Sequence, residues 1–153
     1  MIATLLRFLE FNDETEQLGE VLWQILAPRI DQVLDAFYQR VQHAGIKPQL
    51  SDASVATLKI KQRAHWQGLL SANFDDRYIA GVQRIGIRHR DIGLDLASYV
   101  AAYMALKIEF TDIVVSRTEL PVLAKGRLIK ALYKYVALDM ALSLSAYEVT
   151  VLD

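Results

Sequence analysis

The stretch that decides the fold is Ile85-Gly86-Ile87-Arg88-His89-Arg90-Asp91-Ile92-Gly93-Leu94. An apolar stripe leads into it, in which Tyr78, Val82, Ile85 and His89 follow one another at spacings of 4, 3 and 4 residues. These spacings put the four side chains on one face of a helix. Gly93 can end this helix, because glycine readily adopts the left-handed conformation that is common after a helix C-terminus. The carbonyl of Ile85, one turn before His89, is then free to accept a hydrogen bond from the histidine ring.

Helical patterns extend outward from this stretch in both directions, and no segment alternates with period two. We expect helices over residues 2–11, 18–26, 30–41, 53–70 and 78–89, a long helix from about Asp95, and a last helix from Pro121 to about Tyr147. Asn12-Asp13 and the segment 73–75 stop one helix and cap the next. Pro28 stands where a new helix can begin. Seven or eight helices in 153 residues favour an all-α, globin-like fold over a four-helix bundle.

The composition describes one domain without disulfides. The chain is 53% apolar and has no cysteine, which excludes zinc–thiolate sites and iron–sulfur clusters. Its 17 basic and 18 acidic residues leave no electrostatic footprint for nucleic acid. The N-terminus lacks the features of a signal peptide, and the longest apolar stretch, Leu96 to Leu106, is too short to span a bilayer. We therefore expect a cytoplasmic protein with no nucleic-acid or membrane partner.

Three histidines, His43, His65 and His89, are the candidate metal ligands. A lone histidine on an apolar face is more often a core residue with satisfied hydrogen bonds. His89 has surroundings that suit a heme iron, which needs a neutral imidazole facing an apolar slot. The stripe supplies the slot, the Ile85 carbonyl can hold the ring tautomer, and the glycines let the backbone pass close to a flat cofactor. His43 lies beside Gly45 at a helix end and is most simply solvated.

The His89 stretch, followed by Ser98-Tyr99 and Tyr103, resembles the proximal half of the globin-coupled sensor family. Three upstream segments are similar to the same family: Phe37-Tyr38-x-x-Val41, His65-Trp66-x-x-Leu69-Leu70-Ser71 and Phe74-Asp75-x-x-Tyr78-Ile79. The resemblance covers essentially the whole chain, although the last helix matches only in length and character. It implies a globin fold with an extra N-terminal helix, a single sensor domain over residues 1–153, and heme b (iron protoporphyrin IX) as cofactor.

The resemblance also implies roles for individual residues. His89 is the axial ligand of the iron, Tyr38 donates a hydrogen bond to dioxygen bound there, and Leu58 lies over the ligand. Tyr99 matches a proximal tyrosine that contacts the histidine in some members. The remaining expected cofactor-binding residues are Phe37, Gln62, Trp66, Tyr78, Val82, Ile85, Ile92 and Tyr103.

Other readings of these residues stay open. Tyr38 can instead bond a backbone carbonyl and only pack, while Leu58 and Tyr99 can be ordinary core residues. His65 is a rival distal ligand, but it lies seven residues after Leu58, or roughly 10 Å along a helix at 1.5 Å per residue. The two cannot both lie over the iron, so we expect His65 at the heme edge or outside the pocket.

The predicted function is an oxygen-sensing heme domain that binds dioxygen, and also CO and NO, opposite His89. Members of the family signal to a C-terminal output domain, often a diguanylate cyclase or a chemotaxis transducer, so we expect no enzyme activity within this chain. The alternative is a free-standing heme enzyme, a dioxygenase or a peroxidase-like globin, in which only Tyr38 or His65 could serve as the acid–base group. A cofactor-free helical interaction module is a third possibility.

The last two long helices predict a homodimer. The final helix carries apolar residues around most of its circumference, with Asp139 as its only charge between Tyr135 and Tyr147. Such a helix must be buried on more than one side. The helix from Asp95 has a second apolar face in Val100, Met104 and Ile108. We expect both helices to pair with their copies in a four-helix bundle, unless residues 2–11 cover the apolar surface within one chain.

Overall fold

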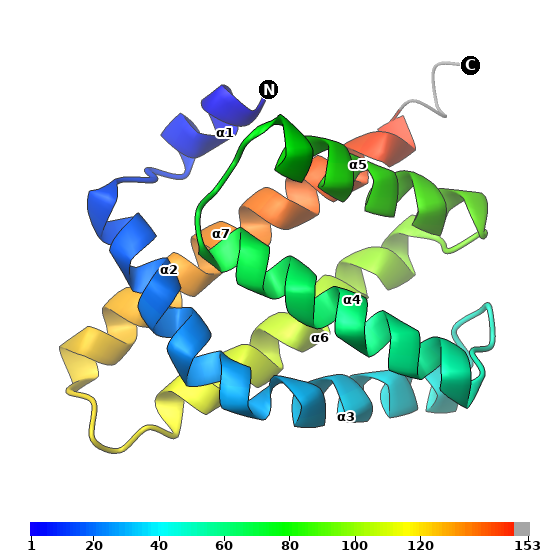
Figure 1. The fold of residues 1–153 in the computed structure, drawn as a ribbon, viewed down its shortest axis with the longest axis horizontal. Helices are drawn as coiled ribbons and strands as arrows, with labels where there is room; N and C mark the ends of the chain where they lie inside the picture. Colours follow the sequence, from blue (N-terminus) through cyan, green and yellow to red (C-terminus); the bar gives the residue numbers. More distant parts are fainter. Residues whose placement is uncertain (149–153) are drawn as a thin grey trace.

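The chain folds into α-helices joined by short loops, as the computed structural model of residues 1–148 shows (Figure 1). The all-helical prediction is therefore confirmed for this part of the chain. The elements are α1 (Ile2–Phe8), α2 (Asp13–Leu26), a 3-10 turn (Ala27–Arg29), α3 (Ile30–His43), α4 (Asp52–Leu70), α5 (Asp76–Asp91), α6 (Leu96–Val115) and α7 (Val122–Glu148). None of the described helices is both long and apolar enough to cross a membrane.

Side-chain caps start several of these helices where the sequence predicted them. Asn12 accepts a hydrogen bond from the backbone N–H of Thr15, 2.9 Å away, and the Thr15 side chain completes a capping box. Asp75 and Asp95 cap α5 and α6 in the same way. These caps set the first residue of each helix, because they satisfy backbone N–H groups that have no partner within the helix.

Two predicted helix ends differ in the structure. The first helix ends at Phe8 instead of residue 11, because Glu10 takes a left-handed conformation (φ 56°) and the N–H of Phe11 turns back to the carbonyl of Leu6. Pro28 does not open a separate helix. It lies in the 3-10 turn that joins α2 to α3, where its missing N–H breaks no helical hydrogen bond.

Helix α7 is the centre of the fold and is buried by other helices of the same chain. It packs mainly on α5, α6 and α2 (Figure 1). Its side chains Leu132, Tyr135, Leu138 and Leu142 are completely buried. The sequence predicts that this helix is buried on more than one side. Helices of the same chain provide much of that burial.

The first helix also covers part of α7. Four apolar residues near the N-terminus pack against the small cluster formed by Val82, Leu138 and Leu142; they are Ile2, Leu5, Leu6 and Leu9. Residues 2–11 therefore cover one section of the apolar surface within the chain. On α6, the outward-facing Ile108 is 57% exposed.

Helices α5 and α7 are in close contact at Gly86. A Cβ atom added to Gly86 would lie 2.0 Å from the backbone oxygen of Ser143 and 3.1 Å from the Cβ of Ala146. Only a residue without a side chain fits at this contact. Gly81, on the same helix, has open space around the position of a Cβ.

We expect Gly86→Ala to lower the free energy of unfolding by about 1–3 kcal/mol, because the added methyl group forces α5 away from the α7 backbone. In a domain of this size, each kcal/mol of lost stability lowers Tm by roughly 2–4 °C. The matched control, Gly81→Ala, should leave Tm unchanged or raise it, since alanine is the better helix former. Thermal unfolding followed by circular dichroism measures both, and equal Tm values for the two variants would contradict the close packing at Gly86.

Candidate functional site

His89 lies in the last turn of α5, and its ring is held by the helix backbone. Its Nδ1 is 2.7 Å from the carbonyl oxygen of Ile85. Because a carbonyl can only accept, Nδ1 carries the proton and donates it. The predicted hydrogen bond to Ile85 is therefore confirmed. This bond fixes the neutral ring in the tautomer whose Nε2 has a free lone pair, which is the arrangement that metal-binding histidines use.

Tyr99 on α6 stacks against the His89 ring. The ring centroids are 4.8 Å apart and the planes differ by 17°. The Tyr99 side chain is buried, and its hydroxyl forms a hydrogen bond with the hydroxyl of Ser143 on α7. Burial raises the pKa of Tyr99 to about 12, so the phenol is neutral. The histidine is thus supported on one side by a ring that is itself anchored to α7.

A short chain of hydrogen bonds between side chains joins α3 to α4. The indole N–H of Trp66 donates to the side-chain oxygen of Gln62 at 2.9 Å, and the Gln62 amide N–H donates to the hydroxyl oxygen of Tyr38 at 3.0 Å. Because an indole can only donate, the orientation of the Gln62 amide is determined. The Tyr38 hydroxyl receives this bond as an acceptor, so its own proton remains available to another group.

Tyr38 is buried in an apolar environment. Only 7% of the residue is exposed, and the ring of Phe37 packs edge-on against it at 5.1 Å between centroids. Burial raises the pKa of the Tyr38 hydroxyl, and the hydrogen bond from Gln62 opposes that effect. Leu58 is half-buried against the same core. Within residues 1–148 the hydrogen-bond partner of the Tyr38 hydroxyl is the Gln62 side chain, and no backbone carbonyl accepts from it.

A buried carboxylate forms a third group that the sequence analysis missed. Asp139 on α7 is 1% exposed and accepts hydrogen bonds from His65 Nε2 (2.8 Å), the Tyr78 hydroxyl (2.9 Å) and the Tyr103 hydroxyl (2.9 Å). These donors come from α4, α5 and α6. The signal in the sequence was the single acid in an otherwise apolar stretch of helix, since a buried charge needs hydrogen-bonding partners.

Several of the predicted site residues belong to the group of side chains around Asp139. Tyr78, Tyr103 and His65 point their polar atoms at Asp139. His65 has no hydrogen bond to Tyr38 or Gln62 among residues 1–148, and it is not part of the group around Tyr38. His43 is exposed at the end of α3, as expected.

The remaining candidates lie along α5 and just after it. Val82 is buried against Leu138 and Leu142 of α7, whereas Ile92 is half-exposed beyond the end of the helix. Helix α5 packs mainly on α7 and makes few contacts with α4. The structure therefore brings together two sets of predicted residues, Tyr38–Gln62–Trp66 and Ile85–His89–Tyr99. No hydrogen bond or aromatic pair joins the two sets within residues 1–148, although Tyr38, Trp66 and Tyr99 belong to the same hydrophobic core.

Residues 1–151 match the sequence model of the protoglobin family. The chain belongs to the protoglobin family. The fold of this protoglobin is also similar to the "globin domain of Geobacter sulfurreducens globin-coupled sensor", with a TM-score of 0.80 and 19% sequence identity. That match covers 95% of this chain and 96% of the other. The predicted globin fold and the resemblance to globin-coupled sensors are confirmed.

The protoglobin should lose stability from the His65–Asp139 pair as pH rises. Burial disfavours the charged imidazolium of His65, but the charge of Asp139 and its hydrogen bond outweigh burial and raise the pKa above 6.5. A group whose pKa is raised by folding stabilises the fold fully below its unfolded pKa and loses that effect as pH rises through the folded pKa.

We therefore expect the difference in Tm between the wild-type chain and His65→Gln to be largest below pH 6.5 and to shrink as pH increases above it. Thermal unfolding between about pH 5 and pH 9 gives this difference, because glutamine retains a hydrogen-bond donor but no titrating charge. His43→Gln is the control, since His43 is exposed. A difference that is flat or grows with pH would be inconsistent with a charged His65 in the fold.

Proposed function

We propose that this chain binds heme b with His89 as the axial ligand and acts as a gas-sensing domain for dioxygen. The observation that carries the proposal is the hydrogen bond from His89 Nδ1 to the Ile85 carbonyl. This bond leaves the lone pair of Nε2 free to bind a metal. When bound, the heme iron would supply reversible binding of a diatomic gas, with CO and NO as further ligands.

The side chains around His89 suit such a cofactor. The Tyr99 ring limits rotation of the imidazole about its bond to the helix. Apolar side chains after the end of α5 are open to contact, since Ile92 is 50% and Leu96 49% exposed. Because α5 is packed on α7 and hardly on α4, a flat group can lie between α4 and α5 without breaking the core. Ile85 and Ile92 are our candidates for apolar contacts to its proximal face.

Tyr38 is our candidate for recognising the gas. Its hydroxyl accepts from Gln62 and keeps its own proton free to donate. A hydrogen bond to a ligand that carries partial negative charge is stronger than one to a neutral ligand. Tyr38 should therefore favour dioxygen over CO. Phe37, Leu58 and the buried Trp66 would exclude water from the same side.

The domain should pass its state to α6 and α7. Tyr99 on α6 stacks on His89 and is hydrogen-bonded to Ser143 on α7, so a movement of His89 reaches both helices. We propose that α6 and α7 form a homodimer through their outer faces, which include the exposed Ile108 and the half-buried Met104, Met140 and Leu144. The similar Geobacter domain belongs to a globin-coupled sensor, and we propose a C-terminal output domain for this protein on that basis.

The heme proposal predicts a Soret absorption band in the purified protein that depends on His89. His89→Ala should lose the heme or hold it loosely, because no other side chain in the described part of α5 offers an imidazole. His43→Ala should keep the wild-type spectrum. Circular dichroism establishes that His89→Ala is folded, and added imidazole should restore the spectrum by replacing the missing ring. A folded wild-type chain that takes up no heme would overturn the proposal.

Tyr38→Phe should release dioxygen faster. A hydrogen bond to a partly charged acceptor contributes about 1–3 kcal/mol, which corresponds to roughly five- to hundredfold in the dissociation rate. The CO dissociation rate should change much less. Tyr133→Phe is the control, because that hydroxyl lies on the surface near Thr111. Stopped-flow measurements give both rates, and equal changes for the two gases would mean that Tyr38 acts through its bulk alone.

The dimer proposal predicts a molecular mass of twice 17.3 kDa in light scattering at micromolar concentration. Ile108→Asp should shift the protein toward monomer, because it places a charge in the proposed interface. The exposed Ile60 on α4 provides the control, and Ile60→Asp should leave the mass unchanged. A monomeric wild-type chain would exclude this route of signalling.

A further inference from the structure

The side chain of Trp66 lies between Gln62 on its own helix and Phe110 on α6. The residue is only 2% exposed, and its ring packs edge-on against Phe110 with 5.1 Å between the ring centroids. Phe110 itself is completely buried. Edge-to-face aromatic pairs favour one relative orientation of the two rings. Helix α6 therefore helps to fix the orientation of the Trp66 indole.

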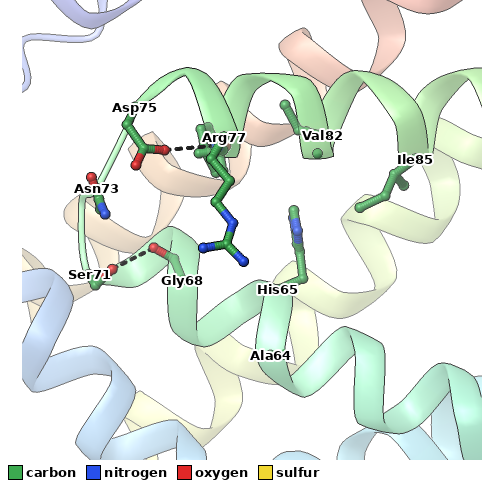
Figure 2. A pocket seen from close by; sticks show the side chains of 11 residues that line it. Ala64, His65, Gly68, Ser71, Asn73, Asp75, Arg77, Val82 and Ile85 are labelled. Carbon is green, nitrogen blue, oxygen red and sulfur yellow. Dashed lines mark hydrogen bonds between the residues drawn. The ribbon is translucent and has the colours of Figure 1, made fainter.

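Trp66 differs in its surroundings from the residue that precedes it. Figure 2 shows His65 projecting from α4 into the cleft between α4 and α5. This cleft is part of the space in which we place the cofactor. Trp66 does not line the cleft and belongs to the main hydrophobic core. A residue in this position can act on a bound gas through its hydrogen bond to Gln62.

The indole N–H of Trp66 selects one orientation of the Gln62 amide. It donates to Oε1 of Gln62 at 2.9 Å, while Nε2 of Gln62 donates to the Tyr38 hydroxyl at 3.0 Å. A flipped amide would place its NH₂ group against the indole N–H, and two donors cannot bond each other. The flipped amide would also present its oxygen to Tyr38, whose O–H would then donate to Gln62. Trp66 thus keeps the O–H of Tyr38 available.

A second contact links the same part of α6 to the helix that carries Tyr38. Arg40, two residues after Tyr38 on α3, forms an ion pair with Glu109 of α6 at 3.3 Å. Both side chains are partly exposed, so this pair by itself contributes little to stability. Residues 109 and 110 nevertheless contact both α3 and α4, the two helices that the Tyr38–Gln62 hydrogen bond joins.

Helix α6 therefore has contacts to both sets of predicted site residues. Tyr99 stacks on His89, and Phe110, eleven residues later, packs on Trp66. The exposed Ile108, which we place in the dimer interface, is two residues from Phe110. A shift of α6 can change the orientation of Trp66 as well as that of His89. Such coupling is reciprocal, because a helix position that alters gas binding is itself altered by the gas.

We propose that Trp66 is a positioning residue through which α6 sets the dioxygen selectivity of Tyr38. This proposal rests on the gas-sensing function proposed above and adds a second route between α6 and the gas. Phe110 orients Trp66, Trp66 orients the Gln62 amide, and the amide leaves the Tyr38 O–H free to donate to dioxygen.

Trp66→Phe tests the hydrogen bond, because it keeps an aromatic ring in the core and removes the indole N–H. We expect the dioxygen dissociation rate to rise roughly two- to tenfold, since a neutral hydrogen bond is lost. The CO dissociation rate should change much less. Once Tyr38→Phe has removed the hydroxyl, adding Trp66→Phe should have no further effect on dioxygen. Trp23→Phe is the matched control, because Trp23 lies on α2 and packs against Arg63.

Phe110→Leu tests the link to α6, with Ile113→Val on the same helix as the control for a smaller core residue. Phe110→Leu should raise dioxygen dissociation, and it should have no further effect when Trp66→Phe is already present. Gln62→Leu removes the same hydrogen bond from a half-buried position, so it tests the bond even where Trp66→Phe does not fold.

Deuterium exchange of the indole N–H provides a measurement that does not depend on gas binding. The chain has two tryptophans, so NMR spectra contain two indole N–H signals, and Trp66→Phe identifies one of them. Exchange at Trp66 should be faster in Gln62→Leu and in Phe110→Leu than in the wild type. It should stay unchanged in Ile113→Val.

Two results would show that Trp66 acts only through its bulk and would overturn the proposal. One is an equal change for dioxygen and CO in Trp66→Phe, and the other is a change that persists in the Tyr38→Phe background. Indole exchange that responds to neither Gln62→Leu nor Phe110→Leu would overturn it as well. If Tyr38→Phe leaves dioxygen release unchanged, the proposed role of Tyr38 is wrong. If Tyr38→Phe speeds release and Trp66→Phe does not, only the role of Trp66 is wrong.

Discussion

The carboxylate of Asp139 is the interaction on which the rest of this structure depends. A buried charge is costly unless hydrogen-bond donors surround it, and here the donors come from three different helices. Asp139 therefore ties α4, α5 and α6 to the central helix α7. Removing any one donor leaves the charge with an incomplete shell, so the relative positions of these helices are coupled. Gln62 on α4, His89 on α5 and Tyr99 on α6 are all carried by helices that meet at this point.

The parts of the fold that depend on neighbours in sequence could be predicted. Caps such as Asn12 and Asp75 act within three residues, and the His89 bond to Ile85 spans one helical turn. The end of α1 was misjudged because the left-handed conformation of Glu10, a residue with no strong preference for it, depends on how the chain turns into α2.

The parts that depend on contacts between distant residues could not be predicted from one sequence. The partners of Asp139 lie 36 to 74 residues away, and no local pattern connects them. The same is true of Tyr38 and Gln62, which are 24 residues apart. It is also true of Gly86, where only glycine fits because the α7 backbone lies against it. The family resemblance directed attention to Tyr38 and His89, but it did not indicate Asp139.

The chain of hydrogen bonds from Trp66 through Gln62 to Tyr38 has a direction. An indole N–H can only donate a hydrogen bond, so each bond along the chain is donated in the direction of Tyr38. The Tyr38 hydroxyl is the last acceptor, and its own O–H remains free to donate. A glutamate at position 62 has nearly the same shape as glutamine but only accepts when ionised. It would draw the tyrosine proton back toward α4 and reverse the last bond. The dioxygen preference that we propose for Tyr38 therefore rests on a single amide nitrogen, that of Gln62.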